Sequence, residues 1–364
     1  MYLESRHRRR QAVRMKRAVF FLPPQMGGAE RMTITIAKTL DRNEYDVRFV
    51  VIGKQMGEIK DFIPEGYPLS LIRIRNIYDF TTLRTYRLLR KIQPQYVCCS
   101  LHYLNPRVII AARWINNCKS IVRFNCAVSR LHGINKYLTR ITYPKATKII
   151  AQTEAMQEDL EHSFPDIRGK IVTMHNLIDI DTIAERLKNA DNPLKSETNK
   201  VFVWVGRLDP VKGVEVLIKA FIEANHQRQD ISLYLVGRYN EQSPYYQNLI
   251  HLVNGSPWVE RIHFVGFQDN PYKWMSNADC FVLSSNSEGS PNVLFEALYL
   301  GVPVAVTDCT PNINDIVKDG VNGYRAKVGD YKGLASAMLK ALNLKNVQVL
   351  YQHSTKDDFK ALFQ

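Results

Sequence analysis

The fold of this chain is decided by residues 283–307, which read LSSNSEGSPNVLFEALYLGVPVAVT. A short apolar run at residues 280–283 leads into small polar residues. Ser290 and Pro291 then have the form of a helix start, with serine as N-cap and proline at the first helical position. Apolar residues follow at helical spacing until Gly301-Val302-Pro303 ends the helix before a second apolar run, Val304–Thr307. The stretch predicts a strand, a loop, a helix and a strand.

Two carboxylates lie in this stretch, Glu288 in the loop and Glu296 on the helix. Open α/β sheets bind ligands outside the carboxyl ends of their strands, which is where Glu288 is expected. The helix start and the helix dipole together make a site for an anion such as phosphate. The backbone N–H groups expected there belong to Gly289, Ser290, Asn292 and Val293. Acids beside a phosphate site suit a phosphorylated sugar or a nucleotide sugar, although either acid alone is more simply a solvated surface group.

The combined pattern is more specific than its parts. Glu-Gly-x-Pro-x-x-x-x-Glu-Ala followed by Gly-Val-Pro-Val resembles the donor-site signature of the family-four retaining glycosyltransferases, which have the GT-B fold. In that family the first acid holds hydroxyls of the donor sugar, the second holds the ribose, and the helix start takes the diphosphate. The resemblance gives these roles to Glu288, Glu296 and the helix start. Ser290 departs from the family, where an aromatic residue is common.

Length and composition fit two soluble domains. The chain has 364 residues, of which 45% are hydrophobic. No apolar run approaches the roughly 20 residues that span a bilayer, and the N-terminus is basic, unlike a signal peptide. We therefore expect a protein of the cytoplasm, at the inner face of the plasma membrane. The six cysteines show no metal-ligand spacing, and the default expectation is reduced structural thiols.

The formal net charge is +14, and the cations are unevenly placed. Seven precede the first predicted strand: Arg6, Arg8, Arg9, Arg10, Arg14, Lys16 and Arg17. Four more follow at Arg84, Arg87, Arg90 and Lys91. Such charge attracts anions, and nucleic acid, an anionic membrane surface and phosphate-bearing substrates all qualify. A solvated tail that keeps the protein soluble is the remaining alternative.

Strand-like runs alternate with helical stretches throughout the first half, as a parallel sheet with crossover helices requires. The runs lie at residues 18–22, 47–52, 69–74, 96–99, 120–124, 148–151 and 171–174. Gly27 and Gly28 follow the first run and precede a helix predicted over residues 29–40. They do not form the Gly-x-Gly-x-x-Gly motif of dinucleotide-binding sites, so the sequence does not favour a nicotinamide or flavin site here. In isolation the two glycines are a turn. The family resemblance places them across the cleft from the donor, near its diphosphate and sugar.

Three polar residues of the first half are candidates for the acceptor side. His102, Arg123 and Asn125 each lie at or just after the end of a predicted strand, so all three are expected at one crevice. The family often has a histidine where Asn125 stands. A histidine such as His102 is more often structural than catalytic.

Residues Leu131–Tyr143 form a basic amphipathic pattern in the same half. Such a helix fits a membrane surface, and it fits a helix docked on its own sheet equally well. The basic tail favours a peripheral membrane role.

The middle of the chain predicts a domain boundary. Residues 176–179 read NLID and resemble the segment that ends the family's first domain, and a polar stretch follows. Asp179 and Asp181 spell an Asp-x-Asp, which we interpret as a turn into the hinge and not as a metal site. The expected parts are a basic tail (1–17), an acceptor-binding domain (18–180), a linker (181–200), a nucleotide-sugar-binding domain (201–345) and a C-terminal tail or helix (346–364).

The second half begins with a strand-like run at residues 201–205 and the sequence GRLDPVKG, residues 206–213. Arg207 and Lys212 leave a strand end and a helix start together, so both can point at one phosphate pair. On spacing alone they are surface salt-bridge partners; the string also resembles the family's diphosphate motif. Later strand ends place Gly237, Arg238 and Phe267 where the resemblance implies the nucleobase slot. Tyr239 replaces the family's second glycine.

The sequence thus predicts an α/β protein of two Rossmann-like domains facing across a cleft, the GT-B fold. The resemblance implies a retaining glycosyltransferase that uses a nucleoside-diphosphate sugar, with UDP favoured, and a glycan or lipid-linked acceptor of bacterial surface polysaccharide. Glu288, Arg207 and Lys212 are the expected catalytic residues, and no metal or other cofactor is expected. A sugar-nucleotide epimerase of the same fold and a basic nucleic-acid-binding protein are the alternatives.

Overall fold

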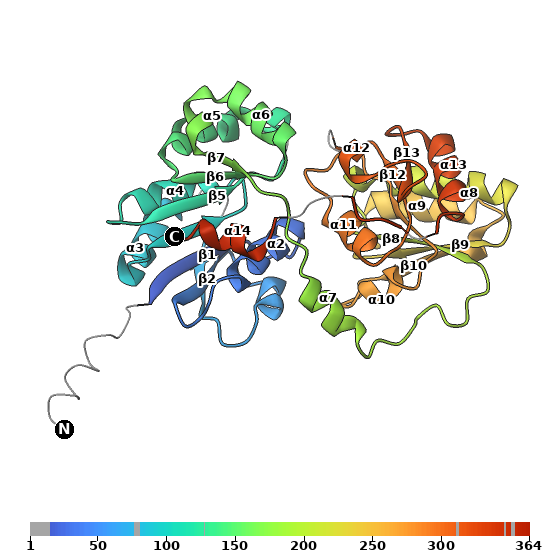
Figure 1. The fold of residues 1–364 in the computed structure, drawn as a ribbon, viewed down its shortest axis with the longest axis horizontal. Helices are drawn as coiled ribbons and strands as arrows, with labels where there is room; N and C mark the ends of the chain where they lie inside the picture. Colours follow the sequence, from blue (N-terminus) through green and yellow to red (C-terminus); the bar gives the residue numbers. More distant parts are fainter. Residues whose placement is uncertain (1–14, 76–80, 127, 311–312, 346, 351–353) are drawn as a thin grey trace. The chain divides into compact units, whose positions relative to one another are not determined.

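The chain folds into two compact units, each built on a parallel sheet (Figure 1). Unit 1 comprises residues 1–177 and 353–364, and unit 2 comprises residues 178–352. The computed structural model describes residues 15–75, 81–126, 128–310, 313–345, 347–350 and 354–364. The prediction of two Rossmann-like α/β domains is confirmed.

Unit 1 contains a seven-stranded parallel sheet with the order β3-β2-β1-β4-β5-β6-β7. The strands are β1 (Lys16–Leu22), β2 (Tyr45–Gly53), β3 (Leu69–Arg73), β4 (Tyr96–Cys99), β5 (Lys119–Arg123), β6 (Lys148–Ala151) and β7 (Ile171–Thr173). The helices of more than one turn are α2 (Gly28–Lys38), α3 (Thr81–Ile92), α4 (Asn105–Arg113), α5 (Gly133–Thr142), α6 (Glu154–Ser163) and α14 (Lys356–Ala361). The strand order reverses at β1, so the carboxyl ends of β1 and β4 form the switch point of this sheet.

Side chains of β1 alternate between two buried faces, which explains its nearly continuous apolar sequence. Phe20 and Leu22 pack with α2 on one face, whereas Val19 and Phe21 pack with α3 and α4 on the other. The C-terminal helix α14 joins the first of these faces. Its neighbour Phe363 is fully buried, with its ring centroid 5.8 Å from that of Phe20.

Unit 2 contains a six-stranded parallel sheet with the order β10-β9-β8-β11-β12-β13. The strands are β8 (Lys200–Val205), β9 (Ile231–Val236), β10 (Ile262–Gly266), β11 (Cys280–Leu283), β12 (Val304–Thr307) and β13 (Gly323–Ala326). The helices are α7 (Ile180–Leu187), α8 (Val214–Gln227), α9 (Pro244–Asn254), α10 (Tyr272–Met275), α11 (Asn292–Tyr299), α12 (Ile313–Ile316) and α13 (Tyr331–Ala341). Helices α8, α9 and α13 cover one face of the sheet, and α7, α10, α11 and α12 cover the other. The switch point lies at the carboxyl ends of β8 and β11.

The predicted strands form within two residues of their expected bounds, and β13 is the strand that the sequence interpretation missed. The predicted linker 181–200 opens with helix α7, because the Asp179 side chain caps its first turn. Lys16 and Arg17, assigned to the basic tail, lie in β1, while residues 1–14 fall outside the described part of the chain. The segment 346–364, predicted as a C-terminal tail or helix, contains helix α14, which belongs to unit 1.

Two further properties bear on the expected location and chemistry. Among the helices that the structure describes, none has both the length and the apolar character needed to cross a bilayer. The six cysteines are free thiols, and Cys98, Cys99, Cys280 and Cys309 are buried.

Candidate active site

The candidate site lies at the switch point of unit 2, where the loop after β8 meets the loop after β11. The first loop contains a short 3-10 helix, Pro210–Lys212, whose N-cap is Asp209. Three hydrogen bonds join the loops, from Asn286 N to Val211 O (2.8 Å), from Asn286 Nδ2 to Pro210 O (2.9 Å) and from Ser284 Oγ to Lys212 O (2.9 Å). These hydrogen bonds hold the backbones of the two loops together and so fix the positions of the side chains that the loops carry.

Gly213 allows this close approach. Its φ of 62° is in the left-handed region, and a Cβ there would lie 2.1 Å from the carbonyl oxygen of Ser284. Any side chain would push the two loops apart. Glycine at this position thus fixes the separation of the residues that the two loops carry.

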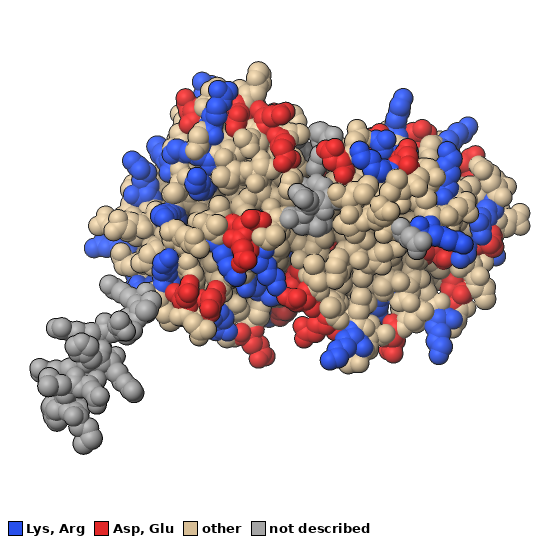
Figure 2. Space-filling view, viewed as in Figure 1, with Lys and Arg blue, Asp and Glu red and all other residues tan. Residues whose placement is uncertain are grey.

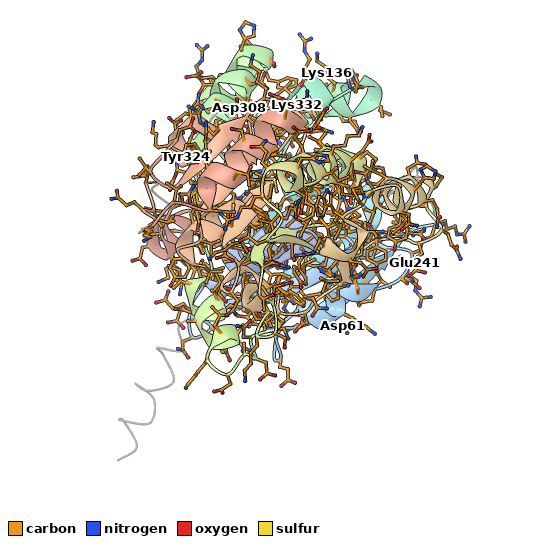
Figure 3. All side chains as sticks on the ribbon, turned by 90° about the vertical axis from the view of Figure 1, so that its right-hand side faces the viewer. Asp61, Lys136, Glu241, Asp308, Tyr324 and Lys332 are labelled. Carbon is orange, nitrogen blue, oxygen red and sulfur yellow. The ribbon has the colours of Figure 1, made fainter. Side chains whose placement is uncertain are left out.

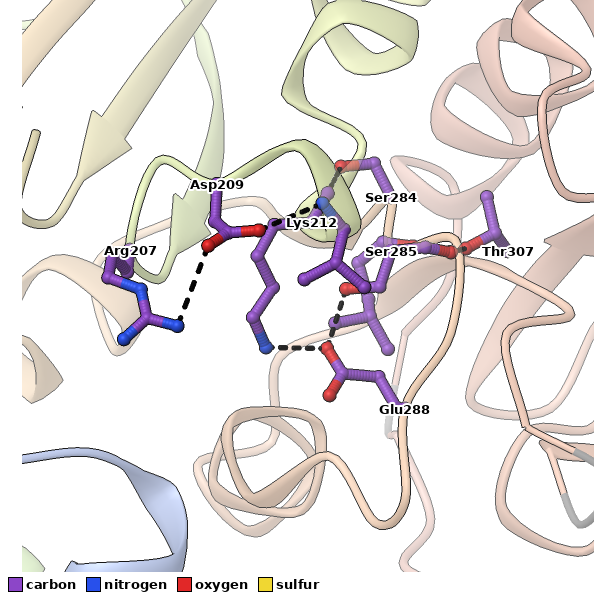
Figure 4. Close-up of polar contacts among 9 residues, drawn as sticks. Arg207, Asp209, Lys212, Ser284, Ser285, Glu288 and Thr307 are labelled. Carbon is purple, nitrogen blue, oxygen red and sulfur yellow. Dashed lines mark hydrogen bonds and ion pairs between the residues drawn. The ribbon is translucent and has the colours of Figure 1, made fainter. Parts of the chain in front are cut away.

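Lys212 and Glu288 meet across the two loops (Figure 4). Lys212 Nζ donates to Glu288 Oε1 at 2.7 Å, and Ser285 Oγ donates to the same oxygen at 2.6 Å. The backbone of Ser285 is held in turn, because Thr307 Oγ1 donates to its carbonyl oxygen at 2.6 Å. The side chains of Lys212 and Glu288 are 27% and 13% exposed, so the pair is partly shielded from water yet reachable.

Arg207 is the second cation of the first loop. Its Nη2 lies 3.6 Å from Asp209 Oδ2, and its side chain is 63% exposed. Asp209 Oδ1 accepts from Val211 N at 3.1 Å, so one carboxylate both caps the short helix that ends at Lys212 and faces Arg207. Figure 4 shows the two cationic side chains extending from this loop in the same direction.

Helix α11 forms as predicted, but it starts one residue later than expected. Pro291 is the N-cap, with extended backbone (φ −80°, ψ 92°), and no side-chain hydrogen bond caps the helix. The predicted cap by Ser290, with Pro291 as the first helical residue, is therefore wrong, because the fixed φ of proline suits both positions. Asn292 and Val293 form the first turn, where helical N–H groups point out of the helix start. Glu288 N donates to Cys309 O at 2.8 Å, which anchors the loop before Gly289.

Glu296 is a buried carboxylate. It is 7% exposed on α11, and the hydroxyl of Tyr272 lies 3.4 Å from its Oε1. The simpler alternative, a solvated acid on a helix surface, does not describe this residue.

The strand ends expected at the nucleobase slot lie side by side. Gly237 N donates to Gly266 O at 2.9 Å, and Leu208 N donates to Arg238 O at 2.9 Å. Gly237 has φ 152°, and a Cβ there would lie 1.5 Å from Gly206 O, so no larger residue fits. The guanidinium of Arg238 stacks over the exposed ring of Phe267 at 4.2 Å from its centroid. Tyr239, at the family's second glycine position, stacks on Tyr246 with centroids 4.6 Å apart.

The remaining candidates lie in unit 1. Gly27 is the N-cap of α2 and Gly28 its first residue. A Cβ on Gly27 would lie 2.7 Å from Glu30 Oε2, because the Glu30 carboxylate folds back onto the start of its own helix. Glu30 is 9% exposed and lies at the start of α2, after β1, near the switch point of unit 1. The sequence interpretation did not single out this residue. The Gly-Gly-Ala-Glu segment was the available signal.

Arg123 differs from the other acceptor-side candidates because it is buried. It is 1% exposed, and its Nη2 donates to Asn176 Oδ1. Burial lowers its pKa to about 10, which nearby Glu30 partly offsets. His102 is partly buried, which lowers its pKa, and Asn125 is partly exposed. Of these three residues, His102 and Asn125 present surface to solvent, whereas Arg123 packs inside unit 1.

The two parallel-sheet units fit the GT-B fold, and the switch point of unit 2 carries two cations, a carboxylate and a helix start, which together suit an anionic ligand. The family model described as Glycosyltransferase Family 4 matches residues 26–182, and the model described as Glycosyl transferases group 1 matches residues 185–356. The chain therefore belongs to the family-four glycosyltransferases. This membership favours sugar transfer over the epimerase and the nucleic-acid-binding alternatives.

Relatives and solved structures extend over nearly the whole chain. An N-acetylgalactosamine-N,N'-diacetylbacillosaminyl-diphospho-undecaprenol 4-alpha-N-acetylgalactosaminyltransferase of Campylobacter jejuni is 24% identical over 95% of both chains. A UDP-Gal:alpha-D-GlcNAc-diphosphoundecaprenol alpha-1,3-galactosyltransferase of Escherichia coli is 23% identical over 90% of this chain and 88% of its own. The structure of Anabaena Alr3699/HepE in complex with UDP and glucose has a TM-score of 0.78 and 19% identity, covering 96% of this chain and 98% of that one. At 19% identity, the similarity to the Anabaena structure shows a shared fold.

Proposed function

We propose that this chain is a retaining glycosyltransferase that moves a sugar from a UDP-sugar to a lipid-linked glycan during synthesis of a bacterial surface polysaccharide such as lipopolysaccharide or capsule. The acceptor class is supported by the two relatives whose names specify diphospho-undecaprenol acceptors. The nucleotide is supported by the UDP in the name of the galactosyltransferase and by the UDP-bound neighbour structure.

The observation that carries the proposal is the Lys212–Glu288 pair at the unit 2 switch point. A diphosphate that binds at the start of α11 replaces Glu288 as the partner of the Lys212 ammonium. Glu288 is then available to accept hydrogen bonds from hydroxyls of the donor sugar, while Ser285 keeps its carboxylate oriented. The 2.7 Å ion pair thus preforms both halves of the donor site.

The chemical step follows from these groups. The bond between the anomeric carbon and the β-phosphate oxygen breaks, and its electron pair stays on the phosphate. The acceptor oxygen bonds to the anomeric carbon on the face that the phosphate leaves, and its proton passes to a phosphate oxygen. Lys212, Arg207 and the start of α11 stabilise the negative charge that develops on the diphosphate, as preorganised donors do. The proposal needs no metal, no other cofactor and no protein nucleophile.

Remaining assignments of the donor site follow the same logic. Glu296 accepts from the ribose, and Arg238 with Phe267 borders the base. The backbone of Gly237 approaches the nucleotide closely, because no side chain intervenes. Gly27 and Gly28 contribute bare backbone toward the diphosphate and sugar, and unit 1, with His102 and Asn125, binds the acceptor.

The proposed place of action is the cytoplasmic face of the plasma membrane, where the protein is peripheral. The lipid-linked acceptors in the names of the relatives and the formal charge of +14 support this location. An anionic surface attracts each suitably placed Lys or Arg by about 1 kcal/mol.

The decisive experiment compares two lysine–glutamate pairs. Lys212→Ala removes a pair at the site, whereas Lys219→Ala removes the Lys219–Glu215 pair, 2.6 Å long, on the outside of α8. We expect a loss of about 10²–10³ in kcat/KM for sugar transfer in the first variant, by analogy with loss of one preorganised donor, and little change in the second. Equal activity of both variants would remove the basis for the proposal.

Ligand binding separates the two partners of the pair. In thermal-shift assays with UDP and a panel of UDP- and GDP-sugars, Lys212→Ala should weaken stabilisation by UDP and by the sugar donor alike. Glu288→Ala should weaken discrimination among the sugars more than it weakens binding of UDP. NMR of the glycosidic product reports its anomeric configuration, and an inverted product or transfer abolished by EDTA would contradict the proposed mechanism.

A further inference from the structure

The Lys212–Glu288 pair is shielded from water more than a typical surface ion pair. Figure 2 shows Lys and Arg beside Asp and Glu at several places on the visible face of unit 2, so pairing by itself is common there. The Lys219–Glu215 pair on α8 has side chains 43% and 56% exposed, against 27% and 13% for Lys212 and Glu288. Water replaces a lost partner easily in the first pair and poorly in the second, so Lys212 and Glu288 each depend on a partner.

The protein side of the Glu288 carboxylate is closed. Ser285 and Thr307 are fully buried, and Cys309, whose carbonyl oxygen accepts from Glu288 N, is 6% exposed. Burial, together with the nearby charge of Glu288, raises the pKa of the Cys309 thiol to about 12. In surroundings of such low polarity a carboxylate stays charged when hydrogen-bond donors lie close to it.

The two donors that reach this carboxylate share one of its oxygens. Lys212 Nζ and Ser285 Oγ both donate to Glu288 Oε1, and Oε2 takes no hydrogen bond from the part of the chain that the structure describes (Figure 4). The bond from Lys212 is charge-assisted and balances the charge of the carboxylate. A balanced carboxylate attracts a neutral hydroxyl less strongly than an unbalanced one does, so a sugar that arrives alone binds poorly.

We propose that the Lys212–Glu288 pair couples the two halves of the donor site, so that the sugar half binds a monosaccharide tightly once a nucleoside diphosphate has drawn Lys212 onto its phosphates. The diphosphate brings several negative charges to one ammonium, so the bond from Lys212 to Glu288 weakens. The carboxylate, still held by Ser285, then needs new donors, and sugar hydroxyls supply them without adding charge.

The inference rests on the proposed donor site and adds a regulation of it. Because Glu288 is engaged until the nucleotide binds, free monosaccharides and the sugars of the acceptor glycan do not fill the donor position first. The site thus favours a sugar that arrives on a diphosphate over the same sugar without one.

Equilibrium binding of UDP to the full chain, with and without a free monosaccharide, tests the coupling. The monosaccharide is the one carried by whichever UDP-sugar stabilises the chain most in the thermal-shift panel, and sucrose at the same concentration controls for effects on the solvent. We expect the monosaccharide to tighten UDP binding by about fivefold or more, since coupling between two sites is reciprocal and commonly of this size. Saturation-transfer NMR should show protein contact of the monosaccharide with UDP present and little without it.

Lys212→Met gives a result of opposite sign for the two ligands. Without the ammonium, Ser285 alone holds Glu288, and the carboxylate is open to hydroxyls at all times. The variant should bind the monosaccharide in the absence of UDP at least about fivefold more tightly than the parent, while UDP binding weakens and the coupling disappears. Local damage to the site would produce no such gain. Lys332→Met, which removes an exposed lysine of α13 (Figure 3), should leave both ligands and their coupling unchanged.

Two further variants separate release of the carboxylate from its orientation. Glu288→Gln removes the charge, so the monosaccharide should bind weakly with and without UDP, and UDP should bind at least as tightly as in the parent because Lys212 has lost its internal partner. Ser285→Ala should keep UDP binding and weaken the monosaccharide about tenfold in the presence of UDP. Asp308→Asn is the control, since this acid of the next loop, labelled in Figure 3, pairs with Arg325 at 3.9 Å.

Two outcomes would overturn the inference. UDP binding that the monosaccharide leaves unchanged in the parent would show that the two halves of the site are independent. Loss of monosaccharide binding in step with UDP binding in Lys212→Met would make Lys212 a contact of both ligands. Sugar transfer measured on the same samples reports the proposed function separately: transfer without coupling removes this inference alone, whereas coupling without transfer removes the enzyme function and leaves the coupled site.

Discussion

The two sheets share a topology but use their switch points differently. In unit 2, Arg207 and Lys212 follow β8 with side chains 63% and 27% exposed. In unit 1, Arg123 ends β5, one strand beyond β4, and is 1% exposed. The same parallel architecture therefore carries cations that a ligand can reach in one unit and a cation enclosed by protein in the other.

The difference shows what burial does to a charge. An exposed cation keeps most of its hydration and can exchange water for a phosphate, so it is available for function. A buried cation has lost its hydration and depends on protein partners, here Asn176 and the nearby Glu30. Arginine near the end of a parallel strand is thus open to a ligand in one unit and enclosed by protein in the other, which fits the binding role that we propose for Arg207.

Arg123→Met should have the largest effect on stability. It leaves the amide of Asn176 and the buried Glu30 without their cationic neighbour, and breaking such a buried arrangement costs about 3–5 kcal/mol. Urea unfolding should show this loss in unit 1, whereas Arg207→Met should change unfolding by less than about 1 kcal/mol because its ion pair is exposed. Equal stability of the two variants would show that the burial of Arg123 has no energetic consequence.

Arg207→Met, which should hardly affect stability, should have a large effect on activity. The variant loses a planar donor pair at the proposed diphosphate, and we expect kcat/KM to fall about tenfold to a hundredfold with a larger KM for the donor. Arg228→Met is the matched control, because Arg228 pairs with Asp230 at 2.8 Å in the same unit, before β9 and away from the candidate site. A drop in the control as large as that in Arg207→Met would point to a general effect of charge.

The contrast between the exposed Arg207 and the buried Arg123 could not be predicted from the sequence. Apolar runs located the strands because buried parallel strands are apolar on both faces, and the Glu288 motif could be recognised as a candidate site because its spacing is local. Arg123 is the last residue of its strand and Arg207 comes just after the end of another, and nothing in the local sequence distinguishes a buried guanidinium from an exposed one. Burial is decided by residues distant in the chain, such as Asn176.

Helix α5 is a second case. The periodicity of residues 131–143 predicted an amphipathic helix, and the helix forms. The pattern alone did not tell which face is buried: the helix buries Thr139 and Thr142, because threonine can face a core once its hydroxyl bonds back to the helix. The start of α11 was displaced by one residue for a different reason, the tolerance of proline for N-cap and first-turn positions.

Substitution of Asp209 should have a smaller effect on the donor KM, and it separates the two functions of this carboxylate in unit 2. Its carboxylate caps the helical turn ending at Lys212 and faces Arg207, so Asp209→Ala loses both functions. We expect a three- to tenfold higher donor KM, about 1 kcal/mol, with kcat nearly unchanged. Asp209→Asn keeps a capping oxygen and should recover part of the loss. If asparagine rescues nothing, the charge toward Arg207 is the only contribution, and if it rescues everything, the cap is.

The smallest expected effect concerns pH, and it again compares the two units. His102 in unit 1 and His263 in unit 2 are partly buried, and burial lowers the pKa of each imidazole below its ordinary 6.5. Above that value both folded and unfolded states are neutral and the histidines leave stability unchanged. As pH falls through it, the unfolded chain binds protons first, so stability declines. In urea unfolding between about pH 7 and pH 5, His102→Asn and His263→Asn should each flatten this decline. Glu197 and Glu260 oppose the shift at His263 without reversing it. A decline of equal steepness in the parent and in both variants would contradict the assignment of burial as the cause of the lowered pKa values.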